Sequence, residues 1–412
     1  MNHFFRLGGG HFIKMLIGFI YIKILSTYLS PKDFGNFSQV LTLVAVMSML
    51  SLGGANNGII KFLSSTKNSK QEWNLVFNKS LSLFLFVNIF YFVLLFFFAN
   101  EISLFILNSE EYALLVKILS FTQVISAFGV FSSVYFTSQI DTKNSSLQTI
   151  TNSLLFLLLL LFCVFFLSKT SLLFTSVYAN FFAGIYGLFY FLTKKRRQIL
   201  RSIEFVKIDF PFIKSLFGYA VVTISGAILW PVAQLYLRGV IGDRLGWDTV
   251  GYWFASAKIS DAYIQFFSIF LLSYLYPRLT SLGEGKKARL FDFCKLYIPL
   301  VIASGSFIFL FSDFIVSILL GSDFSSSSYY VKLQVIGDVF KLVYSLFLIY
   351  MLSCGKIKYS IAVEFINSIS CVIITSYLID IVGWKAPLVG YISTQVITFV
   401  YVFYFSIRLK NK

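Results

Sequence analysis

Long apolar stretches, separated by short polar connections, make up most of this chain. One of them, from Leu154 to Leu167, contains no charged residue at all. A helix that spans a membrane needs about 20 mostly apolar residues. The stretches that approach or exceed this length are 9–29, 36–63, 75–99, 113–138, 147–168, 173–192, 213–239, 251–276, 291–312, 329–353, 360–381 and 387–407. The pattern therefore predicts twelve transmembrane helices.

The apolar runs are typical of helices rather than of barrel strands, because a barrel strand alternates apolar and polar residues. The composition agrees: 58% of the residues are hydrophobic and 13% are charged, whereas about 25% are charged in a soluble protein. A water-soluble globule is therefore excluded. The predicted fold class is an all-α, polytopic membrane protein.

The formal net charge of +16 would suggest nucleic-acid binding in a soluble protein. Here most of the cations outside the helices lie in every second connection between predicted helices. Nineteen lie in the two termini and the even-numbered connections, counted from the one between the first two helices: Arg6, Lys67, Lys70, Lys143, Lys194, Lys195, Arg196, Arg197, Arg201, Lys207, Arg278, Lys286, Lys287, Arg289, Lys356, Lys358, Arg408, Lys410 and Lys412. Four lie on the opposite side: Lys32, Lys169, Arg244 and Lys385. The positive-inside rule then predicts that both termini lie in the cytoplasm. The basic excess is thus a topology signal, and no nucleic-acid partner is expected.

The longest soluble stretch is basic and falls at the middle of the chain. It predicts three parts: an N-terminal six-helix lobe (1–192), a cytoplasmic linker (193–212) and a C-terminal six-helix lobe (213–412). A weak internal repeat supports two halves, because Gly35-Asn36-Phe37 and Gly251-Tyr252-Trp253 each follow a helix that carries a cation near its end. Parallel repeats of this kind place a substrate site between the lobes and work by alternating access.

Several charged residues lie deep within predicted helices, where each costs about 2.5–3.5 kcal/mol even on the most lenient scale. The cations of this set are Lys23, Lys61, Arg238, Lys258 and Lys341, and the acids are Asp261 and Asp338. Spacing of three residues predicts that Lys258 pairs with Asp261 and that Lys341 pairs with Asp338. Two interpretations stay open: the set lines a cavity, or it holds helices together.

The excess of cations favours a wet, electropositive central cavity and an anionic cargo, since Lys and Arg can replace the hydration of a diphosphate. Polar residues at two helix breaks are candidates for binding sugars. Asn56 and Asn57 lie in the glycine-rich break 53–58, and Gln234 follows the kink predicted at Trp230-Pro231. Asp261 and Asp338 are candidates for coupling transport to an ion gradient.

The sequence predicts no catalytic residue, cofactor or metal site. Its four cysteines are far apart and its two histidines, His3 and His11, lie near the N-terminus. There is no Gly-rich phosphate loop ending in Gly-Lys-Ser/Thr. The outer connections are also too short to house a periplasmic catalytic site.

The segments 52–61, 218–223, 246–247, 257–263 and 276–279 together resemble the bacterial O-antigen flippases (Wzx-type), in particular the branch that includes the enterobacterial common antigen flippase. The resemblance implies a fold shared with multidrug exporters and lipid II flippases. It also implies a cargo, an undecaprenyl-diphosphate-linked O-antigen or similar repeat unit, which moves from the cytoplasmic to the periplasmic leaflet.

Polymerase and chain-length proteins of the same pathway, together with membrane lipids, are the implied partners. Two alternatives remain beside the flippase. The first is an exporter of another small or lipidic substrate on the same fold, and the second is a membrane glycan polymerase or ligase. The acidic cavity expected of a cation exporter and the large outer loop expected of a polymerase are both missing from the pattern.

Overall fold

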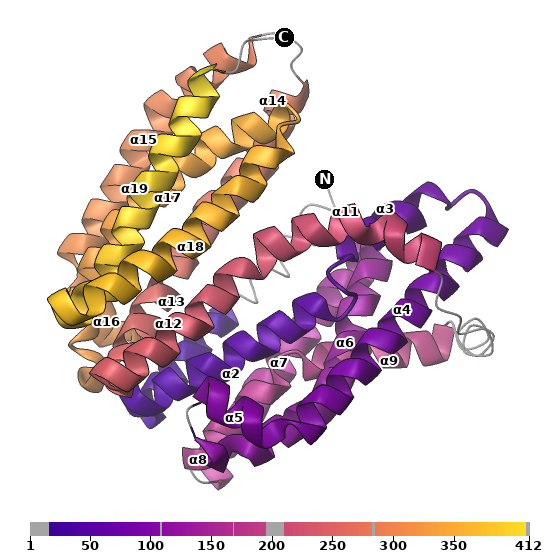
Figure 1. Ribbon diagram of the computed structural model, residues 1–412, viewed down its shortest axis with the longest axis horizontal. Coiled ribbons are helices and arrows are strands. Elements are labelled where there is room, and N and C mark those ends of the chain that lie inside the picture. Colours follow the sequence, from indigo (N-terminus) through magenta and orange to yellow (C-terminus); the bar gives the residue numbers. More distant parts are fainter. Residues whose placement is uncertain (1–15, 108, 168, 195–209, 282–284, 409–412) are drawn as a thin grey trace. The chain divides into compact units, whose positions relative to one another are not determined.

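A computed structural model of the protein describes residues 16–107, 109–167, 169–194, 210–281 and 285–408 (Figure 1). The described residues are almost entirely helical and include no strand. The predicted all-α fold class is therefore confirmed.

Each of the twelve predicted stretches is helical over most of its described residues, and 36–63 is interrupted at 51–55. Within the described chain, nine helices are long and apolar enough to cross a membrane. One of these nine, Ile357–Arg408, contains two predicted stretches, which are α18 (Ile357–Val382) and α19 (Ala386–Arg408). Two predicted stretches are not among these nine helices. They correspond to the short helix Leu16–Tyr28 and to the more polar α13 (Trp247–Phe270).

The chain divides into two compact units. The N-terminal unit comprises residues 1–28 and 36–235, and the C-terminal unit comprises residues 29–35 and 236–412. The predicted linker 193–212 lies mostly outside the described residues, so the predicted lobe boundaries stay a prediction. Helix α11 (Phe210–Ala227), which follows that linker, belongs to the N-terminal unit.

The N-terminal unit is a bundle around a core of aromatic side chains. Besides Leu16–Tyr28 and α11 its helices are α2 (Pro31–Leu50, from residue 36 onward), α3 (Asn56–Ser65), α4 (Lys70–Phe97), α5 (Ala99–Leu107), α6 (Ala113–Gln139), α7 (Thr142–Phe166), α8 (Lys169–Thr175) and α9 (Phe181–Lys194). Phe77, Phe131 and Phe191 are fully buried and contact one another across α4, α6 and α9. This cluster holds the three helices together.

Glycines allow α9 to pack directly on the backbone of α6. A Cβ at Gly184 would collide with the backbone of Ile125 and Ser126, and a Cβ at Gly187 would lie 2.7 Å from the Phe128 carbonyl oxygen. Close approach through small residues is the usual way in which membrane helices associate, because lipid supplies no hydrophobic drive between them.

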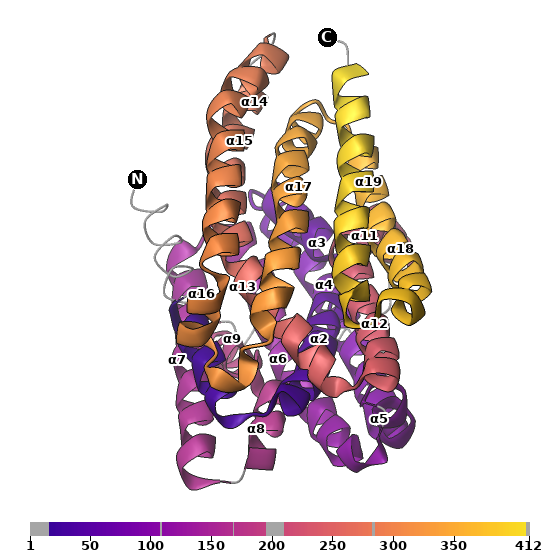
Figure 2. The same ribbon diagram turned by 90° about the vertical axis from the view of Figure 1, so that its left-hand side faces the viewer.

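The C-terminal unit is a second helical bundle. Its helices are α12 (Leu229–Leu245, from Tyr236 onward), α13, α14 (Tyr276–Ser281), α15 (Lys286–Leu310), α16 (Ser312–Leu319), α17 (Ser327–Ser353), α18 and α19. Helix α17 packs against α13, α15 and α19, and α15, α17 and α19 run alongside one another in Figure 2. One turn of π-helix, Leu271–Leu275, joins α13 to α14.

The beginning of α2 belongs to the C-terminal unit because two glycines let it approach α13. A Cβ at Gly35 would lie 2.7 Å from the Trp247 carbonyl oxygen, and one at Gly251 would collide with the Pro31 carbonyl group. These are the two glycines of the repeated Gly-x-aromatic pattern. Phe34 is also fully buried against Phe254 and Phe324.

Both predicted helix breaks are present. Between α2 and α3, Gly53 and Gly54 have φ values of +62° and +73°, a conformation that residues with a side chain rarely adopt. At Ile228 the chain passes from α11 into α12, three residues before Pro231, whose ring cannot donate a backbone hydrogen bond.

The outward faces of the helices carry large apolar side chains, such as Phe105 (84% exposed) and Phe165 (71% exposed). Serine, threonine, asparagine and glutamine are instead found among the buried residues. This reversal of the soluble pattern is what a lipid environment requires, and it leaves the polar side chains inside the units.

Candidate functional site

Arg238 is the most deeply buried of the predicted cationic residues. It lies on α12 within the C-terminal unit and is 6% exposed. Its guanidinium carbon is 5.0 Å from the ring centroid of Phe254 and 5.9 Å from that of Trp253, both on α13. Cation–π contact with these rings orients a charge that the apolar interior would otherwise disfavour.

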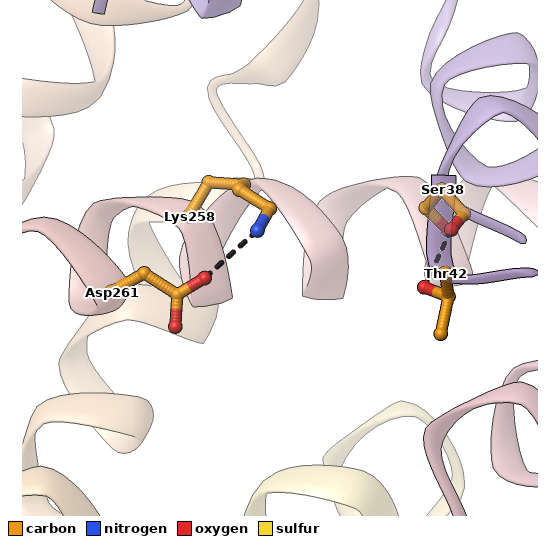
Figure 3. A network of polar contacts seen from close by, with 4 residues as sticks. All are labelled: Ser38, Thr42, Lys258 and Asp261. Atoms are coloured by element: carbon orange, nitrogen blue, oxygen red, sulfur yellow. Dashed lines mark hydrogen bonds and ion pairs between the residues drawn. The ribbon is translucent and has the colours of Figure 1, made fainter. Parts of the chain in front are cut away.

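Lys258 lies beside Arg238, because its Nζ is 5.2 Å from the same Phe254 ring. It also donates to Asp261 Oδ2 at 2.8 Å, one turn along α13 (Figure 3). The predicted Lys258–Asp261 pair is thus confirmed. In that pair the side chain of Asp261 is 62% exposed and that of Lys258 is 33% exposed, so the pair is a partly solvated one. Figure 3 also shows Ser38 and Thr42 of α2, where the Thr42 hydroxyl donates to the Ser38 carbonyl at 2.8 Å.

Asp338 on α17 is fully buried, and its partners differ from the prediction. The Tyr391 hydroxyl of α19 donates to Oδ1 at 2.7 Å, and the Tyr263 hydroxyl of α13 donates to Oδ2. Lys341 forms no ion pair with Asp338 in the described chain, so the predicted pairing is wrong. Lys341 is half-buried on α17.

The two tyrosines explain why Asp338 does not need the lysine. Each phenol supplies one strong donor to a carboxylate, and such bonds are shorter and stronger than neutral ones. The three residues come from three helices that are far apart in sequence, so spacing along one helix could not identify them. Tyr263, Tyr391 and the aromatic rings around Arg238 were not among the site residues that the sequence predicted.

Lys61 is the predicted cation at the break in the N-terminal unit. It is exposed, and its Nζ donates to the Tyr219 hydroxyl of α11 at 2.7 Å. Helix α11 lies close enough for this contact because Gly58 has no side chain: a Cβ there would lie 2.8 Å from Leu216 Cδ2.

The remaining predicted residues of the N-terminal unit are dispersed. Lys23 is exposed on Leu16–Tyr28, where its carbonyl oxygen accepts hydrogen bonds from Ser26 and Thr27. Gln234 is 8% exposed on α12, and Asn57 is exposed on α3. Asn56 is half-buried and lines a polar cavity of about 350 Å³ inside the unit. The structure thus brings together Arg238, Lys258 and Asp261 in one unit, and Lys61 with Asn56 and Asn57 in the other.

No group of three or more His, Cys, Asp or Glu residues that could hold a metal ion occurs in the described part of the chain. The cysteines Cys163, Cys294 and Cys371 are buried, and Cys354 is partly buried. The side chains described at these sites offer cations, hydroxyls and amides.

Helical bundles with a lipid-facing apolar surface define the class of polytopic membrane proteins, and solved structures of membrane transporters have this fold. An inward-facing multidrug resistance MATE family transporter of the MOP superfamily matches with a TM-score of 0.74 and 12% identity, covering 95% of this chain and 94% of its own. The lipid II flippase MurJ in an inward closed conformation matches with a TM-score of 0.75 and 15% identity, covering 98% of this chain and 87% of its own.

The chain belongs to the family described as polysaccharide biosynthesis protein, whose model matches residues 2–282. It is also 22% identical over 404 residues to the lipid III flippase of Escherichia coli (strain K12), covering 94% of this chain and 93% of that protein. The lipid III flippase of Shigella flexneri matches equally well. The family relationship that the sequence segments predicted is therefore confirmed.

Proposed function

We propose that this protein is a transporter, not an enzyme, and that it is a flippase for a lipid-linked oligosaccharide. The similarity to the lipid III flippases over 94% of the chain carries this proposal. The fold supports it, since the MurJ likeness extends over almost the whole length. The finer proposal is that the cargo is an undecaprenyl-diphosphate-linked repeat unit of O-antigen or a similar surface polysaccharide, moved from the cytoplasmic to the periplasmic leaflet of the inner membrane.

The cations inside the helices are the proposed ligands of the diphosphate: Lys23, Lys61, Arg238, Lys258 and Lys341. Phosphate oxygens accept charge-assisted hydrogen bonds from guanidinium and ammonium groups. Arg238 is suited to this role because its planar group can form two parallel bonds, and its stacking on Phe254 and Trp253 fixes the plane in advance. Asn56, Asn57 and Gln234 are the proposed contacts for sugars, and alternating access is the proposed mechanism.

Deletion and complementation test the proposal. Cells that make a surface glycan and lack the gene should accumulate the lipid-linked unit in the cytoplasmic leaflet, and restoring the gene should return surface glycan. Accumulation in the periplasmic leaflet would contradict the proposal, because it would place the defect after translocation, at a polymerase or ligase step.

A second candidate is an exporter of small molecules, which the fold likeness to MATE transporters favours. A drug exporter should raise resistance to cationic compounds when it is overproduced, without any effect on surface glycan. Restored glycan with unchanged drug susceptibility would favour the flippase.

Ion coupling through Asp261 or Asp338 is a further part of the proposal. The two acids differ in setting, because Asp261 is partly solvated in an ion pair while Asp338 is enclosed by tyrosines. We expect that Asp338→Asn changes the dependence of transport on an imposed proton or sodium gradient, and that Asp261→Asn changes it less. Gradient-driven transport in vesicles measures this. Unchanged gradient dependence in the double variant would exclude both residues.

A further inference from the structure

A polar cavity lies inside the N-terminal unit, apart from the proposed diphosphate ligands. Its volume is about 350 Å³, and it is formed by α3, α6, α7 and the start of α9. The lining residues are Asn56, Ile60, Ser126, Gly129, Val130, Ser133, Val134, Thr137, Gln148, Thr149, Asn152, Ser153, Asn180 and Ala183. None of them is charged.

The side-chain amides of Gln148 and Asn152 are already bonded within the protein. Gln148 Nε2 donates to the Gly129 carbonyl at 2.8 Å, to Ser132 Oγ at 2.8 Å and to the Ala183 carbonyl at 3.1 Å. Asn152 Nδ2 donates to the Ala179 carbonyl at 2.9 Å, while its Oδ1 accepts from the Ala183 backbone at 2.8 Å. These bonds fix the shape of the wall.

Two oxygen atoms of the lining are buried without a hydrogen-bond partner. They are Asn56 Oδ1 and Ser126 Oγ. Ser126 is 1% exposed, and its hydroxyl differs from those of Thr149 and Ser153, which donate to carbonyl oxygens one turn back. A buried polar atom without a partner costs about 1–3 kcal/mol. Asn56 Oδ1 can only accept a hydrogen bond, whereas the Ser126 hydroxyl can accept or donate. The wall therefore favours an occupant that supplies a donor to Asn56 and a hydroxyl or similar group to Ser126.

The chemistry of the wall selects among the possible occupants. A phosphate group offers acceptors and negative charge, and it would meet an acceptor at Asn56 with no cation in the lining. A metal ion would meet no carboxylate. Sugar hydroxyls and acetamido N–H groups are neutral donors that fit Asn56 Oδ1 and Ser126 Oγ. The apolar side chains of Ile60, Val130 and Val134 suit the C–H surface of a sugar ring.

The placement of the cavity also matches a sugar that is bonded to a diphosphate. Asn56 and Ile60 are one turn apart on α3 and line the cavity, and Lys61 follows directly on the same helix. The same short helix thus carries a neutral cavity-lining residue and a cation, although Lys61 lies on another face, toward Tyr219 of α11.

We propose that this cavity is a binding subsite for one neutral sugar residue of the lipid-linked cargo. The inference rests on the proposed flippase function and adds a location for glycan recognition within a single unit. It assigns Ser126 and Ser133 on α6 and Asn56 on α3 to sugar recognition, whereas the cations recognise the diphosphate.

The test compares two lipids in vesicles that contain the full-length protein: undecaprenyl diphosphate carrying N-acetylglucosamine, and undecaprenyl diphosphate without a sugar. Ser133 is exposed within the cavity, so Ser133→Leu fills the space with an apolar side chain. We expect about tenfold slower translocation of the sugar-bearing lipid and less than twofold change for the sugar-free lipid. Ser65→Leu is the matched control, because Ser65 is an exposed serine of the same unit that does not line the cavity.

Equal slowing of both lipids, or no slowing of either, would overturn the sugar subsite. If the unmodified protein moves neither lipid, the proposed function itself fails, so the two failures are distinguishable. A second measurement does not depend on the leucine variant. Ser133→Cys should react with a small maleimide, and the sugar-bearing lipid should slow that reaction several-fold while the sugar-free lipid should not. Absence of this protection would also overturn the proposal.

Discussion

At the scale of single residues, the protein places aromatic side chains beside the charges of its helices. Arg238 is buried and faces Phe254 and Trp253, Lys61 is exposed and bonds to Tyr219, and Asp338 is buried and bonded by two tyrosines. Aromatic side chains of this kind stabilise a charge through the ring face or through the phenol hydroxyl.

Arg238 gives the first prediction. Arg238→Ala should lower transport by at least about tenfold, since a charge-assisted hydrogen bond contributes about 1.5–3 kcal/mol. Arg238→Lys should retain part of the activity, because it keeps the charge and loses the planar group. Surface glycan and the lipid-linked pool are the readouts, with protein level measured in parallel.

Arg244→Ala is the matched control for Arg238 because it changes the same residue type on the same helix. Arg244 is half-exposed in an ion pair with Asp380 at 2.7 Å, and exposed pairs contribute little. We expect its transport to stay within twofold of the unmodified protein. Equal loss in both variants would mean that α12 needs positive charge in general, and would remove Arg238 from the proposed ligands.

The tyrosines around Asp338 give the second prediction. In Asp338→Asn one carboxylate oxygen becomes an amide N–H₂, which faces a phenol donor instead of accepting from it. We expect a loss of about 1–3 kcal/mol in stability. Tyr391→Phe should then cost less in the asparagine background than in the unmodified protein, with a coupling of at least about 0.5 kcal/mol.

The four proteins to compare are the unmodified chain, Asp338→Asn, Tyr391→Phe and the double variant. Their free energies of unfolding in detergent give the coupling. Tyr377→Phe serves as the control, since Tyr377 lies in the same unit on α18 and is 73% exposed. If the effects of Asp338→Asn and Tyr391→Phe are simply additive, the hydrogen bond between their side chains does not contribute to stability.

At the scale of helices, the apolar pattern was sufficient to locate the long helices, because length and hydrophobicity are properties of one segment. The glycine pair at 53–54 and the proline at 231 likewise act locally, so both breaks were predictable. Short apolar helices such as α5, α8 and α16 were not predicted, since runs of 7 to 9 residues are too short to stand out as spans.

The polar site was less predictable than the helices because its contacts join distant segments. Lys258 and Asp261 are neighbours on one helix, and the sequence identified that pair. The partners of Asp338 lie 75 and 53 residues away in the sequence. The rule that residues three apart on a helix form a pair therefore pointed to Lys341, which is not a partner. The cavity was also invisible in the sequence, apart from Asn56, because it needs four helices to form.

The α6–α9 contact gives the third prediction. Gly184→Ala places a methyl group against the backbone of Ile125, which cannot move away within a helix. We expect separation of α6 from α9 and a strong loss of folded protein. Gly218→Ala on α11 is the control, because a Cβ there meets nothing within 4 Å and alanine has the higher helix propensity. Yield of folded protein after size-exclusion chromatography in detergent measures both. A Gly184→Ala variant with normal yield would show that α9 can shift without loss.

At the scale of the whole molecule, the compact units do not follow the order of the chain. Residues 29–35 pack with the C-terminal unit and residues 210–235 pack with the N-terminal unit. Glycines at both places make the exchange possible: Gly35 and Gly251 where α2 meets α13, and Gly54 and Gly58 where α3 meets α11. Each predicted half therefore contributes a segment to the core of the other unit.

This exchange leads to the fourth prediction, which concerns a chain cut within residues 195–209. The fragment before the cut lacks α11, which covers Gly54 and Gly58 and supplies Tyr219 to Lys61. The fragment after the cut lacks Pro31 and Phe34, which pack on α13. We expect each fragment alone to be degraded, and the two co-expressed fragments to co-purify and restore surface glycan. When the chain is cut after Leu235 instead, the first fragment retains α11. We therefore expect this fragment to be degraded less when it is expressed alone. If either fragment of the first cut accumulates alone as a folded protein, the exchanged segments are dispensable, and the units would then be independent six-helix lobes as the sequence pattern predicted.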